Sequence, residues 1–253
     1  MPITPSSRTR LEKAAVDNGF DLELAQEGDW LGFASSHAPL RVWLTALGDG
    51  FFLAAMSQLN VLRAIAEHGT SFSSPLPAGA CGARGVKDFG SLHRLLHRAF
   101  LLSRTLPDEL LKAFERETAG LPRSTEIERL VIQRLGQDKF RDGLLGLWEG
   151  RCAMSGLAVV QLLRASHIKP WASCDRDQER LDVYNGFLLS ANLDAAFDGG
   201  LITVADDGLV LVSNALNSEA RVLLGLDQPV KVRRIDEKHM RYLAWHRGHL
   251  FKT

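Results

Sequence analysis

The sequence predicts an α+β protein with two domains, a small N-terminal α+β domain and a C-terminal domain of short strands and helices. Three observations predict this fold class. Short apolar runs bounded by turn residues indicate strands, and amphipathic segments beside them indicate helices. The chain has 253 residues, of which 45% are hydrophobic, enough for two modest domains. A Gly-Leu-Pro sequence at residues 120–122 marks the preferred boundary, giving domains 1–120 and 121–253.

The N-terminal part contains both helical and strand patterns. Helical spacing of apolar residues is found in four segments, residues 6–18, 58–68, 92–103 and 107–118. Apolar runs predict three strands, at residues 30–35, 40–47 and 51–57. Gly48–Asp49–Gly50 is expected to form the hairpin turn between the last two strands. Residues 70–85, rich in Ser, Pro, Gly and Ala, predict a loop. Nothing in these residues states a role, so a DNA-recognition module, a ligand sensor and a dimerisation unit all remain open.

The C-terminal part is predicted to run from a helix into strand, loop, strand and helix. Ser124 opens the first helix, and an apolar run from Val159 to Ile168 indicates a strand that Lys169–Pro170 stops. Residues 172–182 are almost wholly polar and predict a solvated loop. A second strand is expected at residues 187–189 and a capped helix at 193–197. A hairpin through residues 205–208 follows, between strands 201–204 and 209–212.

Four polar residues in this region suit the cleavage of a phosphodiester. Asp194 and Asp198 are four residues apart, so on a helix they share one face. Carboxylate oxygens are hard ligands that suit Mg²⁺ or Mn²⁺. A neutral imidazole at His167 could deprotonate a water for attack on phosphorus, while the metal stabilises the leaving oxygen. Asn185–Gly186 is by itself only a turn signal.

Several motifs in order resemble those of the HNH endonucleases, over residues 124 to 252. They are GQDKFRDGLLGLWEGRCAMSG, ASHIKPW, ERLDVYNGFLLSANLDAAFDGGLITV and YLAWHRGHLF. The resemblance implies a ββα-metal nuclease domain with a divalent metal ion, Mg²⁺ or Mn²⁺, and DNA as substrate. It implies that His167 is the general base and that Asn185 braces the loop. It also implies that Asp194 and Asp198 bind the metal, with Asp194 in place of the family's usual histidine or asparagine.

Two departures from the family pattern are visible. Many members have an Asp or His ligand immediately before the base, but Ser166 stands here, and a serine hydroxyl is a poor metal ligand. Other branches have two CxxC pairs for zinc, whereas only Cys152 remains of the first pair. Because Cys81 and Cys174 lie elsewhere, the sequence predicts no structural zinc and a packed apolar support instead.

Four cations are expected to contact the substrate, namely Lys169, Arg180, Arg233 and Arg234. The last two belong to a basic run that is equally consistent with a solvated face. The chain carries 30 Lys and Arg against 30 Asp and Glu, so any DNA contact must come from a local patch. Structural alternatives also stay open for His167 as a hydrogen-bonded strand end and for Asp198 as part of a helix cap.

The sequence therefore predicts a metal-dependent DNA endonuclease acting in restriction or defence. The alternatives are a non-cleaving DNA-binding module with a degenerate site, and a toxin or effector nuclease restrained by a partner. No run of eighteen apolar residues is present and the N-terminal residues lack the apolar core of a secretory signal, so a cytoplasmic location is expected. One site cuts one strand, so a double-strand break needs two visits or a homodimer.

Overall fold

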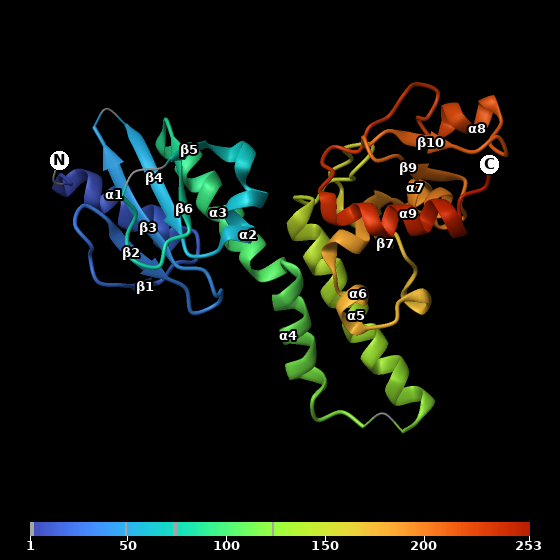
Figure 1. Cartoon of the computed structure of the whole chain (residues 1–253), viewed down its shortest axis with the longest axis horizontal. Helices are drawn as coiled ribbons and strands as arrows, with labels where there is room; N and C mark the ends of the chain where they lie inside the picture. Colours follow the sequence, from blue (N-terminus) through green and yellow to red (C-terminus); the bar gives the residue numbers. More distant parts are fainter. Residues whose placement is uncertain (1–2, 49, 73–74, 123) are drawn as a thin grey trace. The chain divides into compact units, whose positions relative to one another are not determined.

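The computed structural model describes residues 3–48, 50–72, 75–122 and 124–253, and divides into two compact units, Met1–Leu106 and Pro107–Thr253 (Figure 1). The division falls one helix before the boundary predicted at 120/121. The reason is that α4 (Pro107–Thr118) packs against α5 (Glu126–Leu147). The two helices approach closely, since a Cβ atom at Gly143 of α5 would lie 2.5 Å from Leu110 Cδ1.

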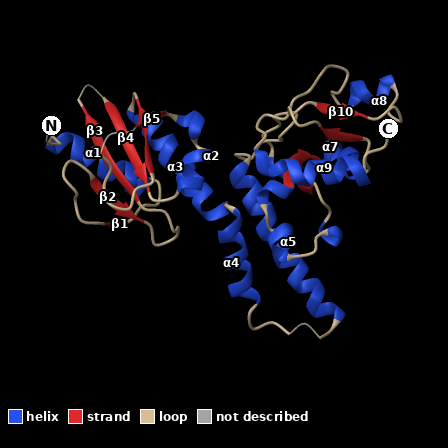
Figure 2. Ribbon diagram, in the orientation of Figure 1, coloured by secondary structure: helices blue, strands red, loops and turns tan. Residues whose placement is uncertain are grey.

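The first unit is an antiparallel sheet with strand order β1-β2-β3-β4-β6-β5 and three helices packed on it and on one another (Figure 2). The strands are β1 (Leu22–Glu23), β2 (Leu31–Ala34), β3 (Val42–Leu47), β4 (Phe51–Met56), β5 (Thr70–Phe72) and β6 (Gly82–Val86). The helices are α1 (Pro5–Asp17), α2 (Leu59–Ala64) and α3 (Phe89–Thr105). Thr4 and Asp88 cap α1 and α3 by accepting hydrogen bonds from first-turn N–H groups.

The prediction of a loop over residues 70–85 is wrong at both ends of the segment, where the structure has β5 and β6. The sequence of β6 contains small residues, so it lacks the alternation of apolar and polar side chains that indicates a strand. Gly85 must be small, since a Cβ there would lie 2.5 Å from the Phe51 ring of β4. The helix predicted at 58–68 is divided into α2 and a 3₁₀ turn, Ala66–His68. Asp49 of the predicted hairpin turn lies outside the described residues, while Leu47 pairs with Phe51 on either side of it.

The second unit is built around an antiparallel hairpin, β7 (Leu163–His167) with β8 (Gly186–Ser190), followed at once by α7 (Ala191–Asp198). Both α5 and α7 pack on this hairpin. The remaining elements are α6 (Asp177–Arg180), β9 (Ile202–Val204), β10 (Val210–Val212), α8 (Ser218–Leu223) and α9 (Met240–His249). The order of β7, β8 and α7 is the ββα arrangement that the sequence predicts.

Two local expectations in this unit are wrong. The first strand begins at Leu163, because Val160–Leu162 forms a 3₁₀ turn whose side chains are exposed. The loop predicted to be solvated contains α6 and buries Cys174 and Leu181. Several of its polar residues bind one another and the backbone, while Asp175, Arg176 and Gln178 are exposed.

The helix α9 is fixed to α7 by a buried histidine. The His246 ring stacks on Phe197 with 4.0 Å between centroids. One of its nitrogens lies 2.9 Å from Thr203 Oγ1 and the other 3.2 Å from the Phe197 carbonyl oxygen. Burial lowers the pKa of His246 to about 4, so the ring is neutral at physiological pH. None of the helices in the described part of the chain is long and apolar enough to cross a membrane.

Candidate nuclease site

The strand β7 presents neighbouring residues to two different helices. Successive side chains of a strand point to opposite faces. Ser166 is buried and directs its hydroxyl to Asp198 of α7. His167 instead stacks on Phe140 of α5, with 3.7 Å between ring centroids and 15° between planes. Within the described residues, no hydrogen bond or ion pair joins His167 to either predicted metal ligand.

Ser166, Asp194 and Asp198 form an oxygen-rich cluster. The Ser166 hydroxyl donates to Asp198 Oδ1 over 3.3 Å, and Asp194 lies one turn earlier on the same face of α7. Burial raises the pKa of Asp194. Burial, and then the negative charge of Asp194, raises the pKa of Asp198 to about 6. Asp198 also keeps an exposed surface, so water screens part of the repulsion between the two carboxylates.

The donor atoms of this cluster fit a hard divalent cation. The two carboxylates lie close enough for the charge of Asp194 to raise the pKa of Asp198, and carboxylate and hydroxyl oxygens are ligands for Mg²⁺ or Mn²⁺. The parts of the chain that the structure describes hold no group of three His, Cys, Asp or Glu side chains suited to a metal.

The His167 ring is held in one orientation by its surroundings. Its Nε2 lies 2.9 Å from the Arg180 carbonyl oxygen, and Trp171 contacts it edge-on. Burial lowers the pKa of His167 to about 4, so the ring is neutral at physiological pH. A carbonyl only accepts, and Nε2 therefore donates its hydrogen to it. The unprotonated Nδ1 makes no hydrogen bond to any residue that the structure describes.

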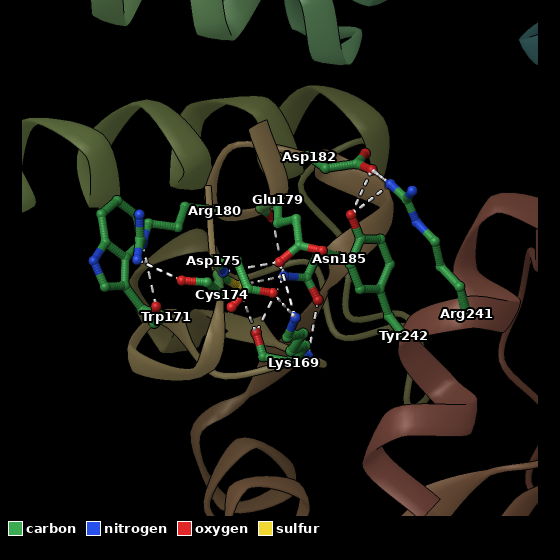
Figure 3. A network of polar contacts seen from close by, with 10 residues as sticks. All are labelled: Lys169, Trp171, Cys174, Asp175, Glu179, Arg180, Asp182, Asn185, Arg241 and Tyr242. Carbon is green, nitrogen blue, oxygen red and sulfur yellow. Dashed lines mark hydrogen bonds and ion pairs between the residues drawn. The ribbon is translucent and has the colours of Figure 1, made fainter. Parts of the chain in front are cut away.

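Asn185 lies at the end of the loop between β7 and β8, immediately before β8, and its side chain belongs to the polar network of that loop (Figure 3). Its buried Oδ1 accepts from the Lys169 N–H over 2.8 Å, and its Nδ2 donates to the carbonyl oxygens of Lys169 and Glu179 over 3.1 and 3.0 Å. The adjacent Gly186 must be small, because a Cβ there would lie 2.4 Å from the Phe140 ring. The Asn185 amide thus joins the backbone of Lys169, near the start of the loop, to that of Glu179, near its end. These two residues lie close in sequence to His167 and Arg180, which are joined by the hydrogen bond of the imidazole ring.

Replacing Asn185 with alanine is expected to destabilise the second unit by about 3 kcal/mol, because it leaves buried backbone groups without partners. Cleavage of DNA should fall further than the loss of folded protein explains, since the Arg180 carbonyl would no longer be fixed against His167. Thermal unfolding and plasmid cleavage measure the two effects. Asn60→Ala is the matched control, as Asn60 is exposed and its side chain binds only the neighbouring N–H of Val61. Equal behaviour of the two variants would contradict the prediction.

The four cations expected to contact the substrate lie in different surroundings. Lys169 Nζ is 2.9 Å from Glu179 and 3.3 Å from Asp175. Arg180 binds Asp177 over 2.9 Å and two loop carbonyls. Arg234 lies 3.9 Å from Glu149, and Arg233 is exposed. The first two cations have partners within the loop, and a substrate role for any of the four stays a prediction.

Asp182 is a structural residue of the site that the sequence did not indicate. Its buried carboxylate accepts from Tyr242 Oη over 2.9 Å and from Arg241 over 2.7 Å, which joins the end of the loop to α9 (Figure 3). It also accepts from the Tyr184 N–H. Burial and the charge of Asp182 raise the pKa of Tyr242, so its hydroxyl stays protonated and donates. Sixty positions separate the partners, and no local pattern marks such a pair.

The lone cysteine of the incomplete CxxC pattern has a packing role. Cys152 is fully buried, and its sulfur accepts backbone hydrogen bonds from Ser155 over 3.3 Å and from Ser190 over 3.4 Å. The Ala153 N–H also binds the Leu188 carbonyl of β8. The segment that includes Cys152 is therefore attached to the hairpin by protein groups, and the prediction that no structural zinc is bound remains a prediction.

A family model described as HNH endonuclease matches residues 152–205, which include β7, the loop, β8 and α7. The C-terminal half of this chain contains an HNH endonuclease domain. The matched family is one of endonucleases, which hydrolyse phosphodiester bonds.

A solved structure also resembles part of this chain. That structure, described as a modification dependent TagI restriction endonuclease, matches with 23% sequence identity and a TM-score of 0.31. The match covers 43% of this chain and 36% of that chain, so the likeness spans about a third of that protein. No curated protein matches the chain.

Proposed function

We propose that the HNH domain is a DNA endonuclease that requires Mg²⁺ or Mn²⁺ and acts in restriction or defence. The observation that supports it best is that Ser166 of β7 lies against the carboxylates of α7, Asp194 and Asp198. The residue that follows Ser166 in β7 is His167. When bound by this cluster, the metal ion stabilises the charge on the phosphate and on the leaving oxygen.

The chain's own residues supply the rest of the reaction. Nδ1 of His167 takes a proton from a water molecule as the water oxygen bonds to phosphorus and the bond from phosphorus to the leaving oxygen breaks. The leaving oxygen then takes a proton from solvent. Arg180 supports this role through its carbonyl, which keeps the ring hydrogen on Nε2 and leaves the lone pair on Nδ1. Asn185 fixes the loop that positions this carbonyl.

The first unit would then select the DNA or sense an activating signal. Its sheet and helices form a unit distinct from the HNH domain, as a selecting module requires. We also propose a cytoplasmic location, and a homodimer wherever both strands are cut. Two other functions stay testable: a DNA-binding module that Ser166 has left inactive, and a toxin nuclease held by a partner, which would be toxic on expression.

Plasmid cleavage tests this function. We expect cutting with Mg²⁺ or Mn²⁺ and none in EDTA, and a preference between methylated and unmethylated plasmid would assign substrate selection to the first unit. Cutting that persists in EDTA contradicts the metal requirement. Binding of DNA without cutting, with every metal and on both plasmids, supports the inactive module instead.

A further inference from the structure

Arg164 lies on the same face of β7 as Ser166. The two residues are separated by one position, and they pair with Leu189 and Phe187 of β8. Since side chains two apart in a strand share a face, Arg164 projects on the side covered by α7, away from Phe140. Arg164 is exposed, whereas Ser166 is buried. A cation thus stands at the open edge of the carboxylate cluster.

The guanidinium of Arg164 is only partly used by the protein. One of its nitrogens donates to the carbonyl oxygens of Gln161 and Leu163, over 3.3 and 3.2 Å. In the described chain no carboxylate lies within ion-pair distance of it, in contrast to Lys169 and Arg180, which have carboxylate partners in the loop. The carbonyl bonds hold the group in place and leave its other donors available to an oxyanion.

The charge of Arg164 acts on the cluster. After burial and the Ser166 hydrogen bond, the positive charge of Arg164 is the next influence on the pKa of Asp194, and it lowers it. A fixed positive charge beside a metal site repels the metal ion. An anion that lies between the two positive charges and binds both of them removes this repulsion. A phosphodiester provides such an anion, because one of its oxygens can face the metal and another the guanidinium.

We propose that Arg164 binds the phosphate that is being cleaved, opposite the Ser166, Asp194 and Asp198 cluster. This inference rests on the proposed nuclease function and adds a residue to it. Arg164 would donate hydrogen bonds to the non-bridging oxygens as negative charge grows on them in the transition state. A second consequence of this arrangement is that the metal and DNA each strengthen the binding of the other, since the phosphate separates the positive charges of the metal and of Arg164.

The experiment compares Arg164→Gln and Arg164→Lys with the wild-type chain in two measurements. With saturating DNA and Mg²⁺, we expect kcat to fall by about 10²-fold in the glutamine variant and by less in the lysine variant, which keeps the charge but not the fork of donors. Without DNA, the glutamine variant should bind Mn²⁺ severalfold more tightly than wild type, because the repelling charge is gone.

The outcomes separate this inference from the function on which it rests. A wild-type chain that does not cleave contradicts the nuclease function, and the inference fails with it. If wild type cleaves and Arg164→Gln retains full kcat, or binds Mn²⁺ more weakly without DNA, the inference alone is wrong. Arg129→Gln is the matched control, because Arg129 is exposed on α5 and its loss changes the net charge equally. It should leave both measurements unchanged.

Discussion

Replacing His167 with alanine is expected to lower the rate of DNA cleavage at saturating Mg²⁺ by about 10²–10⁴-fold, with little change in DNA affinity. The neutral ring offers an unprotonated Nδ1, and alanine has no group that can take a proton from water. Because burial lowers the pKa of His167 to about 4, the base form is present throughout the neutral range. The loss in the variant should therefore be the same at pH 6.5 and pH 8.

Folding must be separated from catalysis in this test, since alanine also removes the stacking on Phe140. His167→Gln serves this purpose, because its amide can still donate to the Arg180 carbonyl but is not a base. His249→Ala controls for the loss of any histidine, as His249 is exposed on α9 and, among the residues that the structure describes, contacts the backbone and ring of Trp245. Cleavage at the wild-type rate by a folded His167→Gln protein would show that another group activates the water.

Replacing Asp198 with asparagine is expected to abolish stabilisation of the protein by Mg²⁺ and yet to stabilise the metal-free protein at pH 7. The pKa of this carboxyl is raised to about 6 in the folded protein, from an ordinary value near 3.8. Its contribution to stability is thus fully present below pH 3.8 and is lost as the pH rises through 6. Asparagine does not ionise, so the variant escapes this loss. Because Asp198 is partly exposed, we expect a gain of about 1 kcal/mol rather than the full value of the shift.

Thermal unfolding of the metal-free proteins between pH 4 and pH 8 measures this effect. The difference between Asp198→Asn and wild type should grow as the pH rises. Asp207→Asn is the opposite control, because a hydrogen bond from Lys231 lowers the pKa of Asp207 and the variant should gain nothing. An Asp198→Asn protein that is less stable than wild type at pH 7 would show that the two carboxylates do not repel each other.

The part of the fold near the site was predictable because its signals are local. Lys169–Pro170 ends β7, and Ser190 and the following residues begin α7. The spacing of Asp194 and Asp198 placed them on one helix face, where burial and mutual repulsion now raise the pKa of Asp198. Ser166, which departs from the family pattern, lies against Asp198.

What the sequence did not reveal depends on contacts between distant residues. The Phe140 ring under His167 comes from α5, and the partners of Asp182 come from α9. The strand β6 does not stand out in the sequence because it contains two glycines, of which Gly85 leaves room for the Phe51 ring and Gly82 lies near Leu62. In the sequence, Arg164 lies within the apolar run of residues 159–168, and no motif marks it. Its significance depends on which face of β7 meets α7, and that is a property of the packing.

The attachment of α9 has a consequence for how the enzyme is made. The His246 ring stacks on Phe197 of α7, and the Tyr242 hydroxyl donates to Asp182 at the end of the loop. The Lys252 N–H donates to the Gly200 carbonyl oxygen. All three anchors lie more than forty positions after the motif that they support. During translation, the segment that contains His167, Asp194 and Asp198 therefore leaves the ribosome well before α9. We expect this segment to become rigid only when α9 has emerged and docked on it.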